Sequence, residues 1–383
     1  MAKKKNNNII VRSEYGNFVD YDAIGKFEFF LNKVSERTDK AFGLRENYEC
    51  DDEALGADVE YFGFNILQDD RMRYIIENIV TLPDSQLSQA NKIGNTIISH
   101  FYGARGIHTV VTGIKDPKKA HVDFELLAKD TDYLEFIKNE VAKSKKAGKK
   151  FYGTTELHTS LQTAARNFCR VKYGDPNRAA SLTDILEWIA SWTADGTTDR
   201  ILNVSSLEQM FKLLREKPGI GEYYGYHCAT SNSVNPALKY QHDEWFCAPG
   251  PGARESLDRI FAPLKASGRT SKMPYGDLTI WIRENQEKLF QNIHIHDFFH
   301  NHTVNDQIIF EDQQDELKVY GTEVGLCQFG VYCYLKENPH LISKRKVARL
   351  EDDSVCDGAL LEAKAAEAEV KVKPKPTSDL IVF

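Results

Sequence analysis

The stretch of sequence that decides the fold is residues 217–261, KPGIGEYYGYHCATSNSVNPALKYQHDEWFCAPGPGARESLDRIF. Helical patterns flank its PGIG segment on both sides, over Leu207–Arg215 and Glu222–Ala229. Two glycines so close together permit positive φ and a tight hairpin between the helices. The fold predicted from this core outward is mostly α, a helix-hairpin-helix architecture with minor β elements.

The hairpin itself is a candidate DNA contact. Gly219 and Gly221 lack Cβ atoms that would block a phosphate. The helix that follows at once turns its free backbone N–H groups toward the hairpin. Gly219, Ile220 and Gly221 are therefore predicted to bind DNA, and the alternative is a corner between two helices with no ligand.

A second glycine-rich segment, APGPGAR at 248–254, is predicted to form a turn that opens a helix over Glu255–Phe261, with Arg254 at its mouth. Exposed N–H groups beside an arginine suit a phosphate or pyrophosphate. Gly250, Gly252 and Arg254 are thus candidates for pyrophosphate binding. The alternative is a rigid loop packed by prolines.

The hairpin and Asp243, 22 positions after Gly221, resemble the helix-hairpin-helix DNA glycosylases. The resemblance implies that Asp243 is the catalytic carboxylate. Members that cleave the DNA backbone carry a lysine two positions after the second glycine, where this chain has Tyr223, so a Schiff-base mechanism is not expected. A surface carboxylate is the alternative for Asp243.

Three further matches resemble one phage family more specifically. They are Gly250-Pro251-Gly252-Ala253, Phe64-Asn65-Ile66 with Asp69-Asp70-Arg71, and Leu326-Cys327-Gln328-Phe329. This pattern, over roughly residues 25–340, is similar to the alpha-glutamyl/putrescinyl thymine pyrophosphorylases, the amino acid:DNA transferases of thymidine hypermodification, which are related to the glycosylases.

The resemblance implies a transferase that installs an amino acid on pyrophosphorylated 5-hydroxymethyluracil in viral DNA and so helps the DNA evade host restriction. Its partners would be DNA containing modified thymidine and a free amino acid. Asp243, Arg254 and Arg166 would be catalytic, and Asn65, Asp70 and Arg71 would contact substrate. Mg²⁺ is a candidate cofactor, with oxygen ligands from Asp69, Asp70 or Glu244.

Three alternatives stay open. The chain could catalyse another step of the same pathway, such as the phosphorylation of 5-hydroxymethyluracil in DNA, although it contains no G-x-x-x-x-G-K-[ST] motif. It could be a monofunctional DNA base glycosylase. It could also be a non-catalytic DNA-binding component.

Composition indicates a globular protein, with 383 residues, 42% hydrophobic and 11% aromatic. The net charge of −7 means that any DNA contact must come from local patches. Seven cysteines without a C-x-x-C, no apolar run of membrane-spanning length and no signal-peptide core predict a cytoplasmic protein, in the host cytoplasm if viral.

The chain is predicted to divide into a basic flexible arm (1–20), one glycosylase-like catalytic region (21–340) and a charged flexible tail (345–383). Two lobes of the catalytic region would meet near 142–153. Helices are predicted over the five ranges Tyr21–Arg37, Ser88–Tyr102, Asp123–Val141, Leu182–Trp192 and Leu278–Asn292, and a short strand over His108–Gly113. Val59–Val80 is predicted to form one long amphipathic helix or a pair of helices.

Two polar segments complete the candidate sites. Five lysines lie within Ala142–Lys150, and Lys145 and Lys146 are predicted to contact the DNA backbone; the alternative is a flexible surface loop. Arg166 lies on the polar side of a helix predicted over Thr155–Val171, where a solvated face is the alternative. Four histidines in His294–His302 suggest a metal, but without H-E-x-x-H or a nearby cysteine a structural role is favoured.

Overall fold

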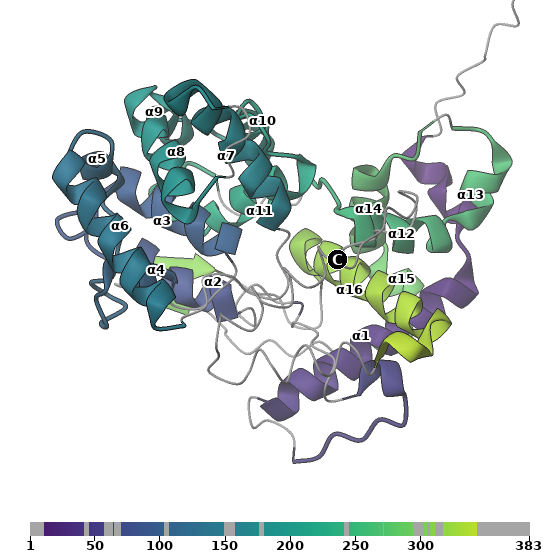
Figure 1. Cartoon of the computed structure of the whole chain (residues 1–383). Coiled ribbons are helices and arrows are strands. Elements are labelled where there is room, and N and C mark those ends of the chain that lie inside the picture. Colours follow the sequence, from purple (N-terminus) through teal and green to yellow (C-terminus); the bar gives the residue numbers. More distant parts are fainter. Residues whose placement is uncertain are drawn as a thin grey trace, which may run out of the picture. The chain divides into compact units, whose positions relative to one another are not determined.

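The computed structural model describes residues 11–41, 46–56, 64, 70–102, 107–148, 158–175, 180–240, 245–270, 272–293, 302–304, 307–310 and 317–342. Helices dominate these residues, and one antiparallel pair of short strands, β1 (His302–Val304) and β2 (Gln307–Phe310), is present (Figure 1). The predicted fold class, mostly α with minor β elements, is confirmed.

The chain forms two compact units. Unit 1 consists of Met1–Asp70 and Asp243–Lys346, and unit 2 is built on Arg71–His242. The boundaries therefore fall at 70/71 and 242/243, and not at 142–153 as the sequence suggested. That segment lies within unit 2, because the helices on either side of it both pack against α8 (Leu182–Ala194).

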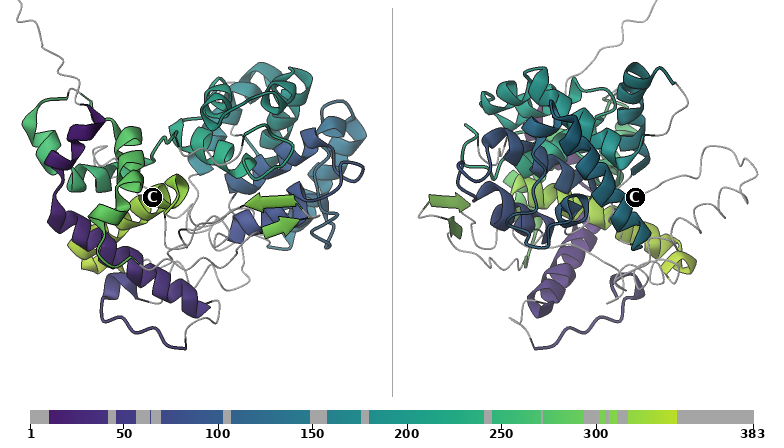
Figure 2. Two further views of the ribbon diagram at one scale, coloured as in Figure 1. Left: turned by 180° about the vertical axis from the view of Figure 1, so that it is seen from behind. Right: turned by 60° about the vertical axis from the view of Figure 1, so that its left-hand side comes forward.

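Unit 1 is a bundle of four longer helices with short helical turns around them. The longer helices are α1 (Tyr21–Ala41), α12 (Pro251–Ile260), α14 (Tyr275–Glu284) and α16 (Val319–Glu337); the shorter ones are η1 (Arg12–Phe18), η2 (Glu53–Leu55), α13 (Ala262–Ser267), α15 (Gln286–Leu289) and η5 (Pro339–Leu341). In two views the purple α1 runs beside the yellow-green α16 (Figures 1 and 2). Aromatic rings fill the core between them. Phe27 and Phe30 are fully buried and lie 5.2 and 5.7 Å from the ring of Phe329.

Small residues set the spacing between α12 and α16. A Cβ added at Gly252 would lie 2.9 Å from the carbonyl oxygen of Cys327, and one added at Gly330 would lie 2.6 Å from that of Gly252. Only glycine at both positions lets the two backbones approach this closely. The Ser256 hydroxyl then donates a hydrogen bond to the Leu326 carbonyl at 2.6 Å, which fixes the register of the pair.

Unit 2 packs its helices around α3 (Gln89–Tyr102) and α8. The remaining elements are α2 (Asp70–Ile75), the π-helical turn η4 (Ile76–Val80), α4 (Ile107–Thr112), α5 (Phe124–Leu127), α6 (Thr131–Lys146), α7 (His158–Tyr173), α9 (Thr197–Leu202), α10 (Leu207–Arg215) and α11 (Glu222–Asn232). Ser181 and Asp184 form a reciprocal capping box at the start of α8.

Buried amides tie the loop before α5 to α3. The Asn95 side chain donates to the Val122 carbonyl at 2.8 Å and accepts from its N–H at 2.9 Å, and the Asn91 oxygen accepts from the Phe124 N–H at 2.7 Å. These bonds satisfy backbone groups that no helix or sheet pairs. They explain why a polar pattern within α3 is compatible with burial.

The predicted strand over His108–Gly113 is wrong, because these residues form helix α4. Its β-branched residues favour a strand locally, but Val111 is fully buried and the Thr112 hydroxyl bonds the His108 carbonyl one turn earlier. Packing against α6 outweighs that weak local preference.

Two predicted helices are interrupted. The helix expected over Asp123–Val141 is split into α5 and α6, because Asp123 and Asp130 each cap a new helix through a side-chain oxygen. Similarly, α14 ends at Glu284 and α15 follows, so Leu278–Asn292 is not one helix. Single-sequence periodicity continues across such breaks, since a cap changes the backbone for only one or two residues.

Six of the seven cysteines fall within the described residues, and all six are free thiols. No helix that the structure describes is both long and apolar enough to cross a membrane.

Candidate functional site

The hairpin between α10 and α11 forms as the sequence predicts. The Lys217 carbonyl accepts a hydrogen bond from the Ile220 N–H at 3.1 Å, which closes a tight turn. Gly219 has φ +84°, the left-handed region that favours glycine. Gly221 instead has φ −78° and ψ −176°, an extended conformation open to any residue. The positive φ expected at both glycines is thus needed only at Gly219.

The start of α11 has the features of an anion site. Gly221 is its N-cap and provides no side-chain cap, so no cap side chain competes for the first N–H groups of the helix. Gly219 and Gly221 are exposed, while Ile220 is buried and anchors the turn. A DNA phosphate can therefore approach the N-terminus of α11 without steric hindrance from the hairpin.

Charges around the hairpin are largely paired within the protein. The Lys217 amine bonds Asp195 at 2.7 Å and lies 5.4 Å from the centroid of the Trp192 ring. The Arg215 guanidinium lies 3.5 Å from the Glu222 carboxylate in the first turn of α11. Glu222 opposes an incoming phosphate at close range, so backbone N–H groups, and not a net positive patch, would provide the attraction here.

Beyond its exposed start, α11 is buried and polar. The His227 ring stacks on the His100 ring of α3, with centroids 5.5 Å apart and planes 7° apart, and lies 4.4 Å from the Tyr223 ring. The Ser231 hydroxyl is 3.2 Å from His100 Nδ1. These contacts hold the hairpin on a rigid support, which periodicity could not reveal because α11 has no apolar stripe.

The predicted glycine-rich turn at 248–254 is wrong in its form, because α12 begins at Pro251 with Gly250 as its N-cap. Arg254 therefore lies inside the first turn of the helix, and Gly252 packs against Cys327 as described above. Proline at the first helical position favours this early start, since its φ suits a helix and it has no N–H to satisfy. A pyrophosphate contact at Gly250 and Gly252 stays a prediction.

A buried carboxylate that the sequence analysis missed lies at this helix start. The Gly250 N–H donates a hydrogen bond to Glu323 Oε1 at 3.0 Å, and Glu323 is fully buried. Burial raises the pKa of the Glu323 carboxyl to about 7, while the bond from Gly250 acts in the opposite direction. The signal was visible in the sequence as a single acidic residue within VYGTEVGLCQFGVYCYL.

Phe64 and the Gly250–Ala253 stretch, which both carry the family resemblance, lie against α16, the helix that contains Leu326–Phe329. A Cβ added at Gly321 would lie 2.2 Å from the Phe64 carbonyl oxygen, so Phe64 packs directly against α16. The Gly250–Ala253 stretch meets the same helix at Glu323 and Cys327. Segments far apart in the sequence therefore converge on α16 within unit 1.

Arg254 is positioned by two neighbours. Its Nε donates to the Pro249 carbonyl at 2.8 Å, and its guanidinium carbon lies 5.5 Å from the centroid of the Tyr275 ring. The Tyr275 hydroxyl in turn donates to Asp258 at 3.0 Å. These contacts fix the direction of the Arg254 guanidinium, which is half-buried.

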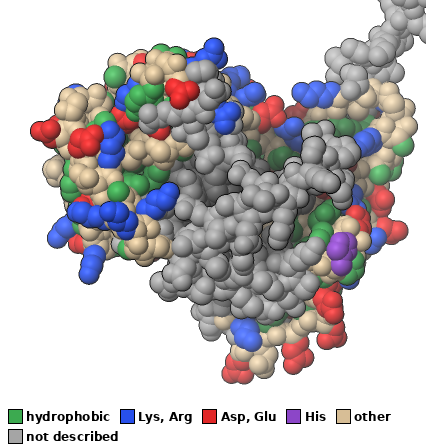
Figure 3. All heavy atoms as spheres, viewed as in Figure 1, with side chains coloured by type: hydrophobic (Ala, Val, Ile, Leu, Met, Phe, Trp, Pro, Cys, Tyr) green, Lys and Arg blue, Asp and Glu red, His purple; other side chains and the backbone are tan. Residues whose placement is uncertain are grey.

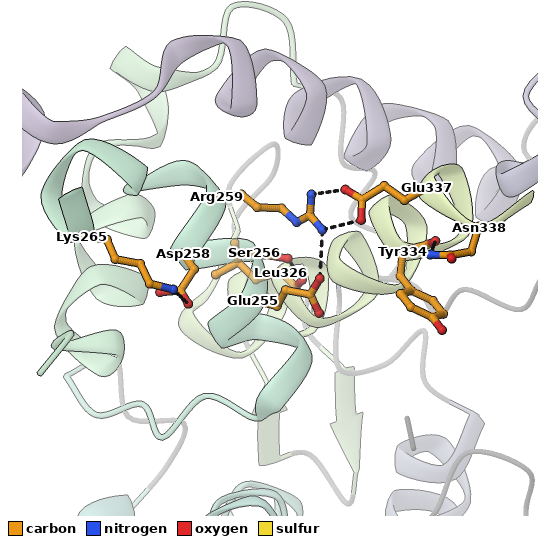
Figure 4. A network of polar contacts seen from close by, with 9 residues as sticks. All are labelled: Glu255, Ser256, Asp258, Arg259, Lys265, Leu326, Tyr334, Glu337 and Asn338. Atoms are coloured by element: carbon orange, nitrogen blue, oxygen red, sulfur yellow. Dashed lines mark hydrogen bonds and ion pairs between the residues drawn. The ribbon is translucent and has the colours of Figure 1, made fainter. Parts of the chain in front are cut away.

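An ion-pair network farther along α12 is structural (Figure 4). Arg259 contacts Glu337 of α16 through both terminal nitrogens, at 2.5 and 3.1 Å, and Glu255 at 2.9 Å. The bond from Arg259 lowers the pKa of Glu337. The network clamps the far end of α12 to α16, and no predicted site residue belongs to it.

The other predicted site residues are placed as follows. Lys145 and Lys146 are exposed in the last turn of α6, so they lie in a helix and not in a loop. Lys and Arg side chains gather on part of the surface of unit 2 (Figure 3). Arg166 is exposed on α7. Asp70 and Arg71 begin α2, with only their backbone described. Asn65, Asp69, Asp243, Glu244 and His294–Asn301 lie outside the described residues.

Metal binding by protein ligands has no support within the part of the chain that the structure describes. There, no group of three or more His, Cys, Asp or Glu side chains is placed to hold an ion. His302, the last member of the histidine segment, lies in β1.

The structure thus defines a mostly helical protein of two compact units, with a tight glycine hairpin between α10 and α11. A family model described as "5-hmdU DNA kinase, helical domain" matches residues 123–339, more than half of the chain, from α5 through α16. The chain belongs to this family, and this membership indicates a role in the modification of 5-hydroxymethyluracil in DNA. No curated protein and no solved structure matches the chain significantly.

Proposed function

We propose that the chain binds DNA through the α10–α11 hairpin and acts as a transferase on 5-hydroxymethyluracil, installing an amino acid on the pyrophosphorylated base. The observation that carries DNA binding is the uncapped N-terminus of α11 behind the exposed, left-handed Gly219. The family description names 5-hydroxymethyluracil in DNA as the modified base, and the region that matches the family contains this hairpin.

In the proposed reaction, the α-amino nitrogen of the amino acid attacks the 5-methylene carbon of the base. The C–N bond forms as the C–O bond to pyrophosphate breaks, and pyrophosphate leaves with the bonding electrons. Asp243 accepts the proton that the nitrogen loses. Arg254, oriented by Pro249 and Tyr275, stabilises the leaving pyrophosphate. The requirement for Mg²⁺ is tested by adding EDTA.

The second candidate function is phosphorylation of 5-hydroxymethyluracil in DNA, which the family description favours. Against it stands the absence of a G-x-x-x-x-G-K-[ST] motif anywhere in the 383 residues. A phosphoryl transfer by this chain would need a different phosphate-binding element.

The decisive experiment offers the protein DNA with 5-hydroxymethyluracil, either unmodified plus ATP or already pyrophosphorylated plus each amino acid. Nucleosides are then analysed by mass spectrometry. The transferase proposal expects a mass gain that depends on the amino acid and disappears in Asp243→Asn, with no alkali-labile sites and no borohydride-trapped adduct. Phosphate gained from ATP identifies the kinase, and abasic sites identify a glycosylase. DNA binding without any product identifies a non-catalytic component.

A further inference from the structure

The lysine of the α10–α11 hairpin is held by an acidic partner within unit 2. Lys217 lies two positions before Gly219, and its carbonyl accepts the hydrogen bond that closes the turn. Its amine forms an ion pair with Asp195 at 2.7 Å and lies 5.4 Å from the centroid of the buried Trp192 ring. The Lys217 side chain is only 13% exposed, whereas that of Asp195 is 50% exposed. At this pair the carboxylate is therefore more open to solvent than the amine.

The Asp195 carboxylate is itself fixed in direction. Asp195 is the C-cap of α8, and its Oδ1 accepts hydrogen bonds from the N–H and the hydroxyl of Thr197, at 3.0 and 2.5 Å. Its Oδ2 accepts from the Lys217 amine. Burial acts to raise the pKa of Asp195, but the bonds from Lys217 and Thr197 together hold it below its ordinary value. A charged carboxylate is thus aimed at the hairpin lysine at neutral pH.

This arrangement opposes a phosphate at the hairpin in two ways. Asp195 repels an approaching phosphate directly, because like charges raise the energy of the complex. In addition, the Lys217 amine can pair with a phosphate only after it leaves Asp195, so part of the attraction to DNA is offset by the loss of the internal ion pair.

We propose that Asp195 limits the affinity of the α10–α11 hairpin for DNA, and that Lys217 exchanges the Asp195 carboxylate for a phosphodiester oxygen when DNA binds. This inference rests on the proposed DNA binding and deepens it, because it names the residue that regulates the hairpin site. A hairpin whose cation is paired within the protein holds DNA weakly, which lets the chain leave one position on DNA and move to another.

The test measures affinity by fluorescence anisotropy, with the intact chain and a DNA duplex that contains one 5-hydroxymethyluracil. Asp195→Asn should strengthen binding by roughly fivefold. It should also steepen the slope of log affinity against log salt by up to about 0.9, because the hairpin gains one net positive charge. The asparagine oxygen can still accept from the Thr197 N–H, so the variant should fold, which its thermal unfolding checks.

A double-mutant cycle with Lys217→Gln identifies the cause of the gain. Lys217→Gln alone should weaken DNA binding, and most of the gain from Asp195→Asn should disappear in the Lys217→Gln background. Glu135→Gln is the matched control, because it removes the same charge and frees Lys138 of α6 from an ion pair of 2.7 Å. Its DNA affinity should stay near that of the wild type.

A purely structural role for Asp195 predicts the opposite sign. If Asp195 only anchors the hairpin, Asp195→Asn should weaken DNA binding, and weaker or unchanged binding overturns this inference while the proposed DNA binding stands. A gain that persists in full in the Lys217→Gln background, or that Glu135→Gln reproduces, also overturns it, since net charge alone then explains the gain. If neither the wild type nor Asp195→Asn binds DNA, the proposed function fails and this inference with it.

Discussion

The backbone N–H of Gly250 donates a hydrogen bond of 3.0 Å to Oε1 of Glu323, from the N-cap of α12 to the first half of α16. The Gly250 N–H, which the sequence had suggested as a donor to pyrophosphate, is thus bonded to a carboxylate of the same unit. Burial in the apolar bundle raises the pKa of the Glu323 carboxyl to about 7, while the hydrogen bond from the Gly250 N–H acts to lower it.

Glu323→Gln is expected to remove a pH dependence of stability. The folded-state pKa of about 7 lies above the ordinary value of 4.5, so the folded protein holds a proton that the unfolded chain releases between these pH values. The free energy of unfolding of the wild type should therefore fall, relative to the variant, by on the order of 2–3 kcal/mol as pH rises from 4.5 to 7.

Denaturant unfolding at several pH values measures this difference. The glutamine side chain keeps an oxygen that can accept from the Gly250 N–H, so the variant should fold. A constant difference between wild type and variant over this range would mean that Glu323 keeps an ordinary pKa and is already ionised at acid pH.

Glycine-to-alanine substitutions at two helical positions should change the free energy of unfolding in opposite directions. At Gly330 the added Cβ would lie 2.6 Å from the Gly252 carbonyl oxygen, so Gly330→Ala should force α12 and α16 apart and cost about 1–3 kcal/mol. At Gly25 of α1 no atom lies within 4 Å, so Gly25→Ala should stabilise the protein by about 0.5–1 kcal/mol. Thermal melts compare the two, and an unchanged melting temperature in Gly330→Ala would show that the helices are not closely packed.

The hairpin prediction concerns Gly219 and Gly221. Gly219→Ala places a side chain in the left-handed region and should cost about 1 kcal/mol. Gly221→Ala meets no neighbouring atom in an extended backbone and should leave stability nearly unchanged. DNA affinity, measured by anisotropy, should fall clearly in Gly219→Ala. Equal DNA affinity in the two variants would mean that the hairpin is a corner between two helices and does not contact DNA.

Charge reversal at the end of α6 tests the second DNA contact. Lys145→Glu with Lys146→Glu should weaken DNA binding and lower the slope of log affinity against log salt by about 0.9 for each phosphate that the protein no longer neutralises. Lys138→Glu is the control, because Lys138 lies on the same helix but pairs with Glu135 at 2.7 Å. A similar loss of affinity in the control would indicate a general electrostatic effect and not a specific contact.

Arg254→Lys tests the leaving-group role. A lysine cannot reproduce a bidentate contact to pyrophosphate, so turnover of pyrophosphorylated DNA should fall by about 100-fold. Affinity for unmodified DNA should change much less. Equal losses in turnover and in binding would assign Arg254 to the DNA backbone.

Several helices and the hairpin of this protein could be predicted from its sequence, because they depend on interactions between residues close in the chain. The helices α1, α3, α8 and α10 and the hairpin after α10 follow from apolar periodicity and closely spaced glycines, which act within a few residues. The sequence motifs also led to 5-hydroxymethyluracil in DNA, which family membership supports.

Only the tertiary structure decided which backbone groups are satisfied by distant partners. A β-branched run became α4 because packing outweighs weak local preference. Gly252 proved to be a packing residue, and Glu323 emerged as a buried carboxylate, because both meet segments about 70 residues away in the chain. By itself the sequence determined the place of α1, α3, α8 and α10 and the start of α11, since caps and periodicity are local. Contacts between helices, which set burial and pKa, depend on the folded arrangement.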